Sequence, residues 1–217
     1  MKGLIIKDLI NMSKSIKIVL ALAVFYGVMA FSTENPSGFA SIILLVLAMS
    51  MLSTYTYDEM ANWDIYALTL PISRDNIIQA KYIFMIIISL LGFILNGLTL
   101  IWINWLTKAS GVFDGLVYVA YGTAIVIWFY SIIIPVITKV GITKARLYIV
   151  LFYTIPFLSG TFIFKQIKKI QPEPPEGLVK FLEILIRNVD TIIPILTIVL
   201  LGISYYISVI IYRKKQF

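Results

Sequence analysis

Six long stretches without a charged side chain dominate this sequence of 217 residues and limit what it can fold into. A helix needs roughly 20 apolar residues to cross the hydrocarbon core of a bilayer, and five of the stretches reach or approach that length unaided. The shortest can add Ile16 and the aliphatic stem of Lys17, whose ammonium group reaches the interface. We therefore predict an all-α integral membrane protein with six transmembrane helices, at about residues 16–33, 39–57, 82–106, 115–138, 147–164 and 191–212.

The overall composition agrees with this class. Hydrophobic residues make up 60% of the chain and charged residues 13%, and the mean hydropathy is +0.95. A soluble domain needs more polar surface than these residues supply. Residues 1–217 are therefore expected to form a single membrane domain.

Several chemistries are excluded by residue types that the sequence lacks. Cysteine and histidine are absent, so disulfides, Cys/His metal sites and histidine acid–base catalysis are excluded. No G-x-x-x-x-G-K-[ST] loop occurs, so the chain is not expected to bind ATP in that way. No charged residue lies in the middle of a predicted span, where an ion-coupled carrier usually keeps one. We predict no catalytic, cofactor-binding or metal-ligating residue.

The distribution of basic residues predicts that both termini lie in the cytoplasm. With six spans, the side that holds the termini carries twelve Lys and Arg and the other side carries six: Lys108, Lys165, Lys168, Lys169, Lys180 and Arg187. The whole net charge of +7 then lies on the cytoplasmic side, so it is an orientation signal and no nucleic-acid partner is expected. The alternative for the first 30 residues is a cleaved signal peptide, which would leave five spans.

Residues 1–14 have their own pattern. Apolar side chains recur at helical spacing with charged and polar side chains between them: Ile5, Ile6, Leu9, Ile10 and Met12 against Lys7, Asp8, Asn11 and Lys14. This pattern predicts a short helix that lies in the cytoplasmic interface and contacts membrane lipid. A cytoplasmic extension of the first span is the alternative.

Residues 58–81 form the only long polar interval in the first half of the sequence. Trp63, Tyr66, Ala67 and Leu70 are spaced i, i+3, i+4 and i+7, which predicts a helix of two turns. The residue before a proline is disfavoured in a helix, so Leu70-Pro71 should end it.

A second helix is predicted to follow directly. Ser73 can cap it, and Asp75 in its first turn is favoured by the helix dipole. If this helix runs from Arg74 to Leu106, it is about 50 Å long, whereas the hydrocarbon core is about 30 Å thick. Its first turns should therefore project into the cytoplasm.

The same interval has an excess of acidic residues on a side that is otherwise basic. Asp58, Glu59, Asp64 and Asp75 outnumber Arg74 and Lys81. An acidic loop with an aromatic stripe favours a protein partner over anionic lipid. In the alternative interpretation the charges pair with one another and Trp63 and Tyr66 belong to the aromatic belt of the interface.

These features resemble the small bacterial permeases of type 2 ATP-binding-cassette (ABC) exporters. The resemblance covers the layout of the whole chain, and its distinctive residues are Asp58-Glu59, Trp63-Asp64, Leu70-Pro71-Ile72-Ser73-Arg74 and Ala80-Lys81-Tyr82. It implies that the N-terminal interfacial helix is the elbow helix and that residues 62–74 dock on an ATPase subunit. The implied docking residues are Trp63, Tyr66, Leu70, Pro71 and Arg74.

The resemblance also implies partners, a location and a cargo. Two cytoplasmic ABC ATPase subunits would bind ATP and Mg²⁺, and a second permease, identical or different, would complete the assembly. The protein would be located in the bacterial cytoplasmic membrane. The small members of the family resemble exporters of antimicrobial or cytolytic peptides, so a peptide or another amphipathic molecule is the expected substrate.

Two further regions are candidates for contact with a substrate. Asn96 places an amide inside the third predicted span, where it should face protein or a cavity, although a plain interhelical hydrogen bond is equally compatible. Residues 165–190 include an apolar stripe with Phe181 and Leu185, which predicts an external amphipathic helix that could cap an exit. The alternative is a solvated connector.

Two other functional classes remain open. One is a secondary carrier or channel without an ATPase, although no charge or filter is visible inside the spans. The other is a membrane immunity or scaffold protein that transports nothing.

Overall fold

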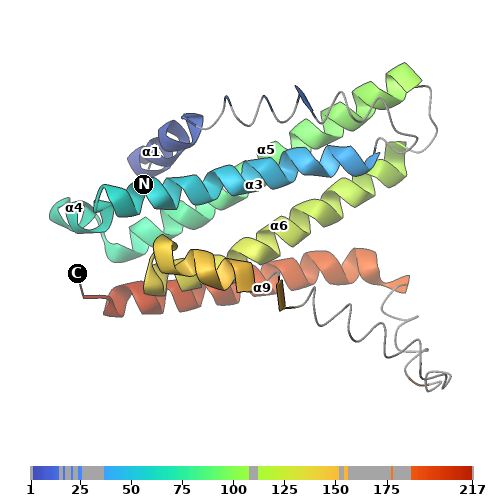
Figure 1. The fold of residues 1–217 in the computed structure, drawn as a ribbon. Helices are drawn as coiled ribbons and strands as arrows, with labels where there is room; N and C mark the ends of the chain where they lie inside the picture. The colour runs from blue at the N-terminus through green and yellow to red at the C-terminus, as the bar shows by residue number, and fades with distance from the viewer. Residues whose placement is uncertain are drawn as a thin grey trace.

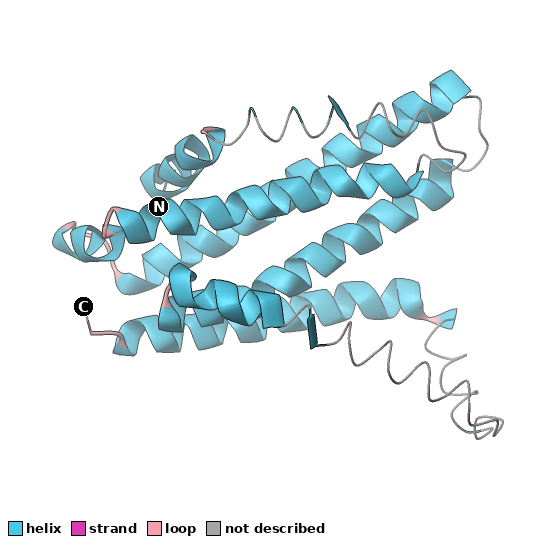
Figure 2. Ribbon diagram, viewed as in Figure 1, coloured by secondary structure: helices cyan, strands magenta, loops and turns pink. Residues whose placement is uncertain are grey.

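The computed structural model describes residues 2–14, 17, 21, 24–25, 37–107, 112–151, 154–155, 177 and 187–216. Within these residues the regular structure is entirely helical (Figure 2). The helices are α1 (Lys2–Ser13), α3 (Ser37–Met60), α4 (Trp63–Thr69), α5 (Arg74–Thr107), α6 (Val112–Val140) and α9 (Val189–Lys214). Residues 142–151 are also helical.

The long helices run alongside one another in an elongated bundle (Figure 1). α3 packs against α5, α5 packs against α6, and α6 packs against α9. α1 lies across α3 and α5 at one end of the bundle, and α4 and the C-terminus lie at that same end (Figure 1). We call it the α4 end.

Three described helices are long and apolar enough to cross a membrane. They are Arg74–Trp102, Gly115–Val140 and Val189–Lys214. The predicted span at 39–57 lies within α3, whereas those at 16–33 and 147–164 fall mostly outside the described residues. The count of six spans and the cytoplasmic side of the termini therefore stay predictions.

The core of the bundle combines large apolar side chains with a few polar ties between helices. Phe84, Met85 and Ile134 are fully buried. The hydroxyl of Tyr82 on α5 lies 2.5 Å from Ser204 Oγ and 2.8 Å from Ser208 Oγ, both on α9. Such hydrogen bonds fix neighbouring helices where hydrophobic driving force between them is weak.

α3 and α5 approach closely at a glycine. A methyl group at Gly92 would lie 2.5 Å from Leu44 Cδ1, so the absence of a side chain there allows the contact. Small residues have this effect at many helix interfaces in membranes.

Candidate coupling site at the α4 end

α4 is a short helix held between the end of α3 and the beginning of α5 (Figure 1). The turn before it uses Asn62 in the left-handed conformation, with φ 48°, which asparagine tolerates better than most residues. Leu70 ends α4 in an extended conformation, and Ser73 Oγ accepts a hydrogen bond of 3.2 Å from the Asn76 N–H. The predicted break at Leu70-Pro71 and the predicted cap at Ser73 are both confirmed.

The predicted length of the following helix is also confirmed. α5 has 34 residues, which corresponds to about 50 Å. Because Asp75 lies in its first turn, a carboxylate stands where the helix dipole favours it.

The predicted stripe on α4 is split between two faces. Ala67 is fully buried, Trp63 and Leu70 are half-buried, and Tyr66 is 56% exposed. The outward face instead carries Ile65 and Tyr66, with Met60 beside them at the end of α3. Sequence reasoning missed Met60 and Ile65, because the spacing of the stripe was counted from Trp63.

A cluster of four charges, of which Asp8 and Lys81 are buried and Lys7 and Asp58 half-buried, lies beside this segment. Lys81 Nζ lies 2.9 Å from Asp8 Oδ1 and 2.6 Å from Asp58 Oδ2. Lys7 Nζ lies 2.6 Å from Asp58 Oδ1 and 3.1 Å from Asp8 Oδ1. Two ammonium groups and two carboxylates thus balance one another and join α1, α3 and α5. We call Lys7, Asp8, Asp58 and Lys81 the four-charge cluster.

The cluster also touches α4. Lys7 Nζ lies 4.4 Å from the centre of the Trp63 ring, and the Trp63 and Tyr66 rings are 5.5 Å apart. The burial of Asp8, whose side chain is 1% exposed, was not foreseen. Its spacing of four residues from buried Leu4 and Met12 is the signal that could have revealed it.

Glu59 fastens a second connection to the end of α3. Its Oε2 accepts hydrogen bonds from the backbone N–H groups of Ile142 (2.5 Å) and Thr143 (3.2 Å), at the start of helical residues 142–151. Partial burial opposes ionisation of Glu59, but the hydrogen bonds from Thr143 and Ile142 outweigh it and lower the pKa of this carboxyl. Arg146 Nη2 adds a bond of 2.9 Å to Thr56 Oγ1 on α3.

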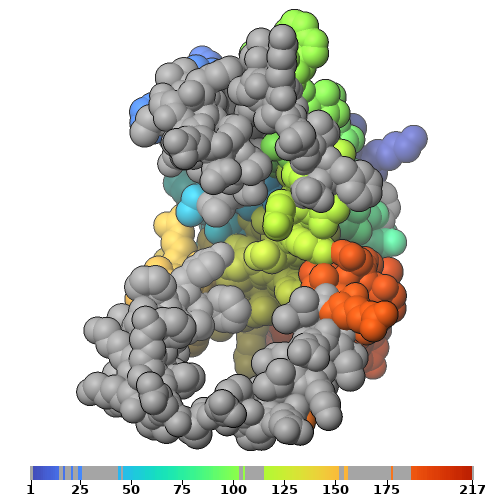
Figure 3. Space-filling view, turned by 90° about the vertical axis from the view of Figure 1, so that its right-hand side faces the viewer, coloured from blue at the N-terminus to red at the C-terminus, as the bar shows by residue number. Residues whose placement is uncertain are grey.

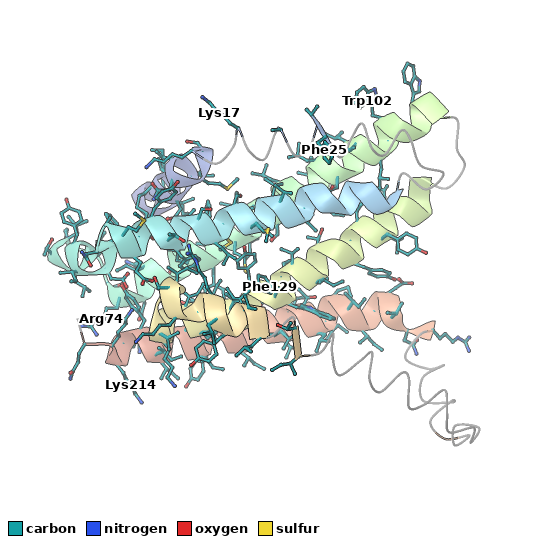
Figure 4. All side chains as sticks on the ribbon, in the orientation of Figure 1. Lys17, Phe25, Arg74, Trp102, Phe129 and Lys214 are labelled. Carbon is teal, nitrogen blue, oxygen red and sulfur yellow. The ribbon has the colours of Figure 1, made fainter. Side chains whose placement is uncertain are left out.

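The C-terminal end of α9 binds to both sides of the α4–α5 break. Arg74 Nη1 donates to the carbonyls of Arg213 (2.6 Å), Lys215 (3.0 Å) and Tyr212 (3.4 Å). Figure 4 shows Arg74 and Lys214 at this end of the bundle. Helix ends leave carbonyls without partners inside the helix, and Arg74 satisfies those of α9.

Salt bridges and a hydrogen bond reinforce this contact. Arg213 forms a two-point salt bridge with Asp75, in which Nε lies 2.7 Å from Oδ1. Asp64 on α4 accepts from the Tyr212 hydroxyl at 3.2 Å and pairs with Lys215 at 3.3 Å.

These contacts bear on two expectations. The acids at positions 58, 59, 64 and 75 bind cations or N–H groups of this chain, as the alternative interpretation of the polar interval expects. Arg74 caps the end of α9, and its docking on an ATPase stays a prediction.

A cavity of about 300 Å³ lies beneath α4. Its walls include Tyr55, Asp58, Asp64, Lys81, Tyr212 and Lys215.

Asn96 is fully buried inside the chain. Its Nδ2 donates to Gly92 O at 2.8 Å within α5, whereas its Oδ1 is buried without a hydrogen-bond partner. In this conformation Asn96 does not line an accessible pathway.

The opposite end of the bundle has a different character. Figure 3 views it, with α6 in yellow-green and the start of α9 in orange. A groove of about 1160 Å³ is lined there by residues of α5, α6 and α9, including Phe93, Tyr118 and Ile198. The Tyr121 hydroxyl donates to Asp190 at its edge. Phe181 and Leu185 lie outside the described residues.

The fold and this site define a helical membrane protein with a short helix fastened at one end of its bundle. The sequence profile of the ABC-2 family transporter proteins matches residues 3–213, so the chain belongs to this family. It is a membrane-spanning permease subunit of an ABC transporter, whose ATPase is a separate protein. No curated protein and no solved structure matches the chain.

Proposed function

We propose that this permease works in an exporter of the bacterial cytoplasmic membrane and that α4 is the helix that receives its ATPase. Two permeases, identical or different, would join two ATPase subunits, each of which binds ATP and Mg²⁺. The resemblance of the residue 58–82 segment to small exporter permeases supports this assembly. It also supports a peptide or another amphipathic substrate.

The observation that carries the proposal is the exposed apolar face at the α4 end. Met60 is 76% exposed, Tyr66 56% and Ile65 55%, and all three lie at or beside α4. Binding energy at protein interfaces concentrates in a few large side chains that become buried in the complex. The end of α3 supplies Met60, and α4 supplies Ile65 and Tyr66. Glu59 fastens the end of α3, and the four-charge cluster and the end of α9 contact α4.

The proposal gives different roles to Trp63, Tyr66, Leu70 and Pro71. Tyr66 is the anchor that would contact the ATPase directly. Trp63 and Leu70 are half-buried and would hold α4 in place, and Pro71 would keep α4 separate from α5.

Co-purification in mild detergent tests the docking face. Ile65→Ser combined with Tyr66→Ala should weaken ATPase binding about thirtyfold, the loss that corresponds to about 2 kcal/mol. Because both side chains are exposed, the isolated permease should keep its wild-type thermal stability. Tyr118→Ala is the matched control, since Tyr118 is a similarly exposed aromatic side chain on α6 and lines the groove at the opposite end of the bundle.

Full retention of the ATPase by the double variant would remove α4 from the docking surface. Trp63→Ala gives a second check with a different signature. It should lower both ATPase binding and permease stability, because Trp63 also contacts Lys7 of the four-charge cluster.

A further inference from the structure

The C-terminal end of α9 contacts both segments that flank the Leu70-Pro71 break. Asp64 precedes the break and pairs with Lys215, whereas Asp75 follows it and pairs with Arg213. Arg74 Nη1 also donates to backbone carbonyls at positions 212, 213 and 215. The three ties connect residues 138 to 151 positions apart in the sequence.

This arrangement restricts the motion of α4. A break between two helices ordinarily allows them to change their angle, because few contacts cross it. Here a change in the angle between α4 and α5 would pull Lys215 away from Asp64 or Arg213 away from Asp75. The end of α9 must therefore move with α4 and α5, or its ties must break.

α9 also connects this end to the other end of the bundle. It has 26 residues, about 40 Å of helix, and it packs along the length of α6. Near its N-terminus Asp190 accepts the hydrogen bond from Tyr121 of α6. A displacement of the C-terminal end can thus reach the groove between α5, α6 and α9.

We infer that the C-terminal end of α9 is a working part of the coupling element, which holds α4 and the first turn of α5 as one body and carries their displacement to α6. Arg74, Arg213 and Lys215 are positioning residues in this role. The inference rests on the proposed docking of an ATPase at α4. It adds a second route from α4 into the bundle, beside α5.

Charge reversal across the pair of Arg213 and Asp75 tests the inference. The full-length permease is purified with its ATPase and reconstituted in liposomes of bacterial polar lipids, and both ATP hydrolysis and the amount of bound ATPase are measured. Arg213→Glu and Asp75→Arg should each lower hydrolysis about fivefold at unchanged ATPase content, within the range that coupling residues give. The double variant should recover most of the loss, because it restores opposite charges.

Lys214→Glu is the matched control. It makes the same charge change on the same turn at a position whose side chain is exposed, and it should leave hydrolysis at the wild-type rate. If the two single variants hydrolyse ATP as this control does, the inference is wrong. If they release the ATPase, the ties serve docking and the inference is also wrong.

A crosslink keeps the test decisive where a charge variant fails to accumulate. The sequence has no cysteine, so Asp64→Cys with Lys215→Cys can be joined by a short reducible linker. Hydrolysis should be unchanged by the crosslink, because α4 and α9 move together. Loss of hydrolysis that reduction reverses would overturn the inference. A wild-type permease that retains no ATPase would instead refute the proposed function.

Discussion

The two ends of the bundle differ in what holds them together. At the α4 end, the four-charge cluster, the Glu59 cap and the ties to α9 connect α1, α3, α4, α5 and α9. At the opposite end, a groove separates helices whose outward side chains are mostly apolar, and the tie between Tyr121 and Asp190 lies at its edge.

This difference assigns the two ends different mechanical properties. Buried ion pairs and caps break at a high cost, so the α4 end should move as a unit. Apolar contacts in lipid can slide, because lipid tails solvate these side chains about as well as protein does. A force applied at α4 would then change the packing mainly at the opposite end.

The largest expected effect comes from breaking the four-charge cluster. Lys81→Met leaves Asp8 and Asp58 without one of their two cations, and removing one partner from a buried network costs about 3–5 kcal/mol. For a chain of this size such a loss lowers the apparent melting temperature by about 10 °C. Thermal unfolding of the purified permease in detergent measures it.

The same measurement at the other end sharpens the comparison. Tyr121→Phe removes an exposed hydrogen bond and should cost about 1 kcal/mol or less. Adding Asp8→Asn to Lys81→Met should recover much of the lost stability, because Lys7 and Asp58 then remain as one balanced pair. Equal losses in Lys81→Met and Tyr121→Phe would refute the contrast between the two ends.

A smaller effect is expected at the turn after α6. Gly141 has φ +81°, and a Cβ there would lie 3.0 Å from Glu59 Oε2. Gly141→Ala should therefore cost about 1–2 kcal/mol through the left-handed backbone alone. Gly202→Ala in α9 is the control, since nothing lies within 4 Å of the added carbon and the helix gains intrinsic propensity. A Gly141→Ala permease as stable as the Gly202→Ala permease would mean that position 141 does not need the left-handed conformation.

The lowered pKa of Glu59 predicts that the stability of the α4 end depends on pH. Because its pKa is lowered from 4.5 in the folded protein, the ionised carboxyl stabilises the fold fully above that value. This contribution is lost as the pH falls through the lowered pKa. The melting temperature of the wild type should exceed that of Glu59→Gln at neutral pH, and the difference should shrink only in solutions more acidic than about pH 4. A difference that does not change with pH would assign the effect to packing.

Local signals in the sequence were sufficient for the helices at the α4 end. The period of the apolar residues, the Leu70-Pro71 break and the Ser73 cap each act within a few residues, and they predicted α4 and the beginning of α5. The partners of the charges were not accessible in this way. Lys81 and Asp8 are 73 positions apart, and Arg74 and Arg213 are 139 apart, so only the packing of the helices brings them together.

Substitution of Asn96 should have the smallest effect on stability. It tests whether this polar side chain inside the bundle takes part in transport. Its Oδ1 already lacks a partner, so Asn96→Leu removes an unsatisfied carbonyl together with one hydrogen bond to Gly92. Replacing a polar group that is not fully satisfied by an apolar one of similar shape is nearly neutral, and a change within about 1 kcal/mol is expected. If Asn96 is only a structural residue, the Asn96→Leu permease should hydrolyse ATP and release substrate in liposomes at the wild-type rates. If Asn96 becomes accessible to substrate in another conformation, transport should fall while the melting temperature and the bound ATPase stay the same. Asn96→Asp separates these outcomes further, because a buried unpaired carboxylate should destabilise the permease in the first case more than in the second, where water reaches the site.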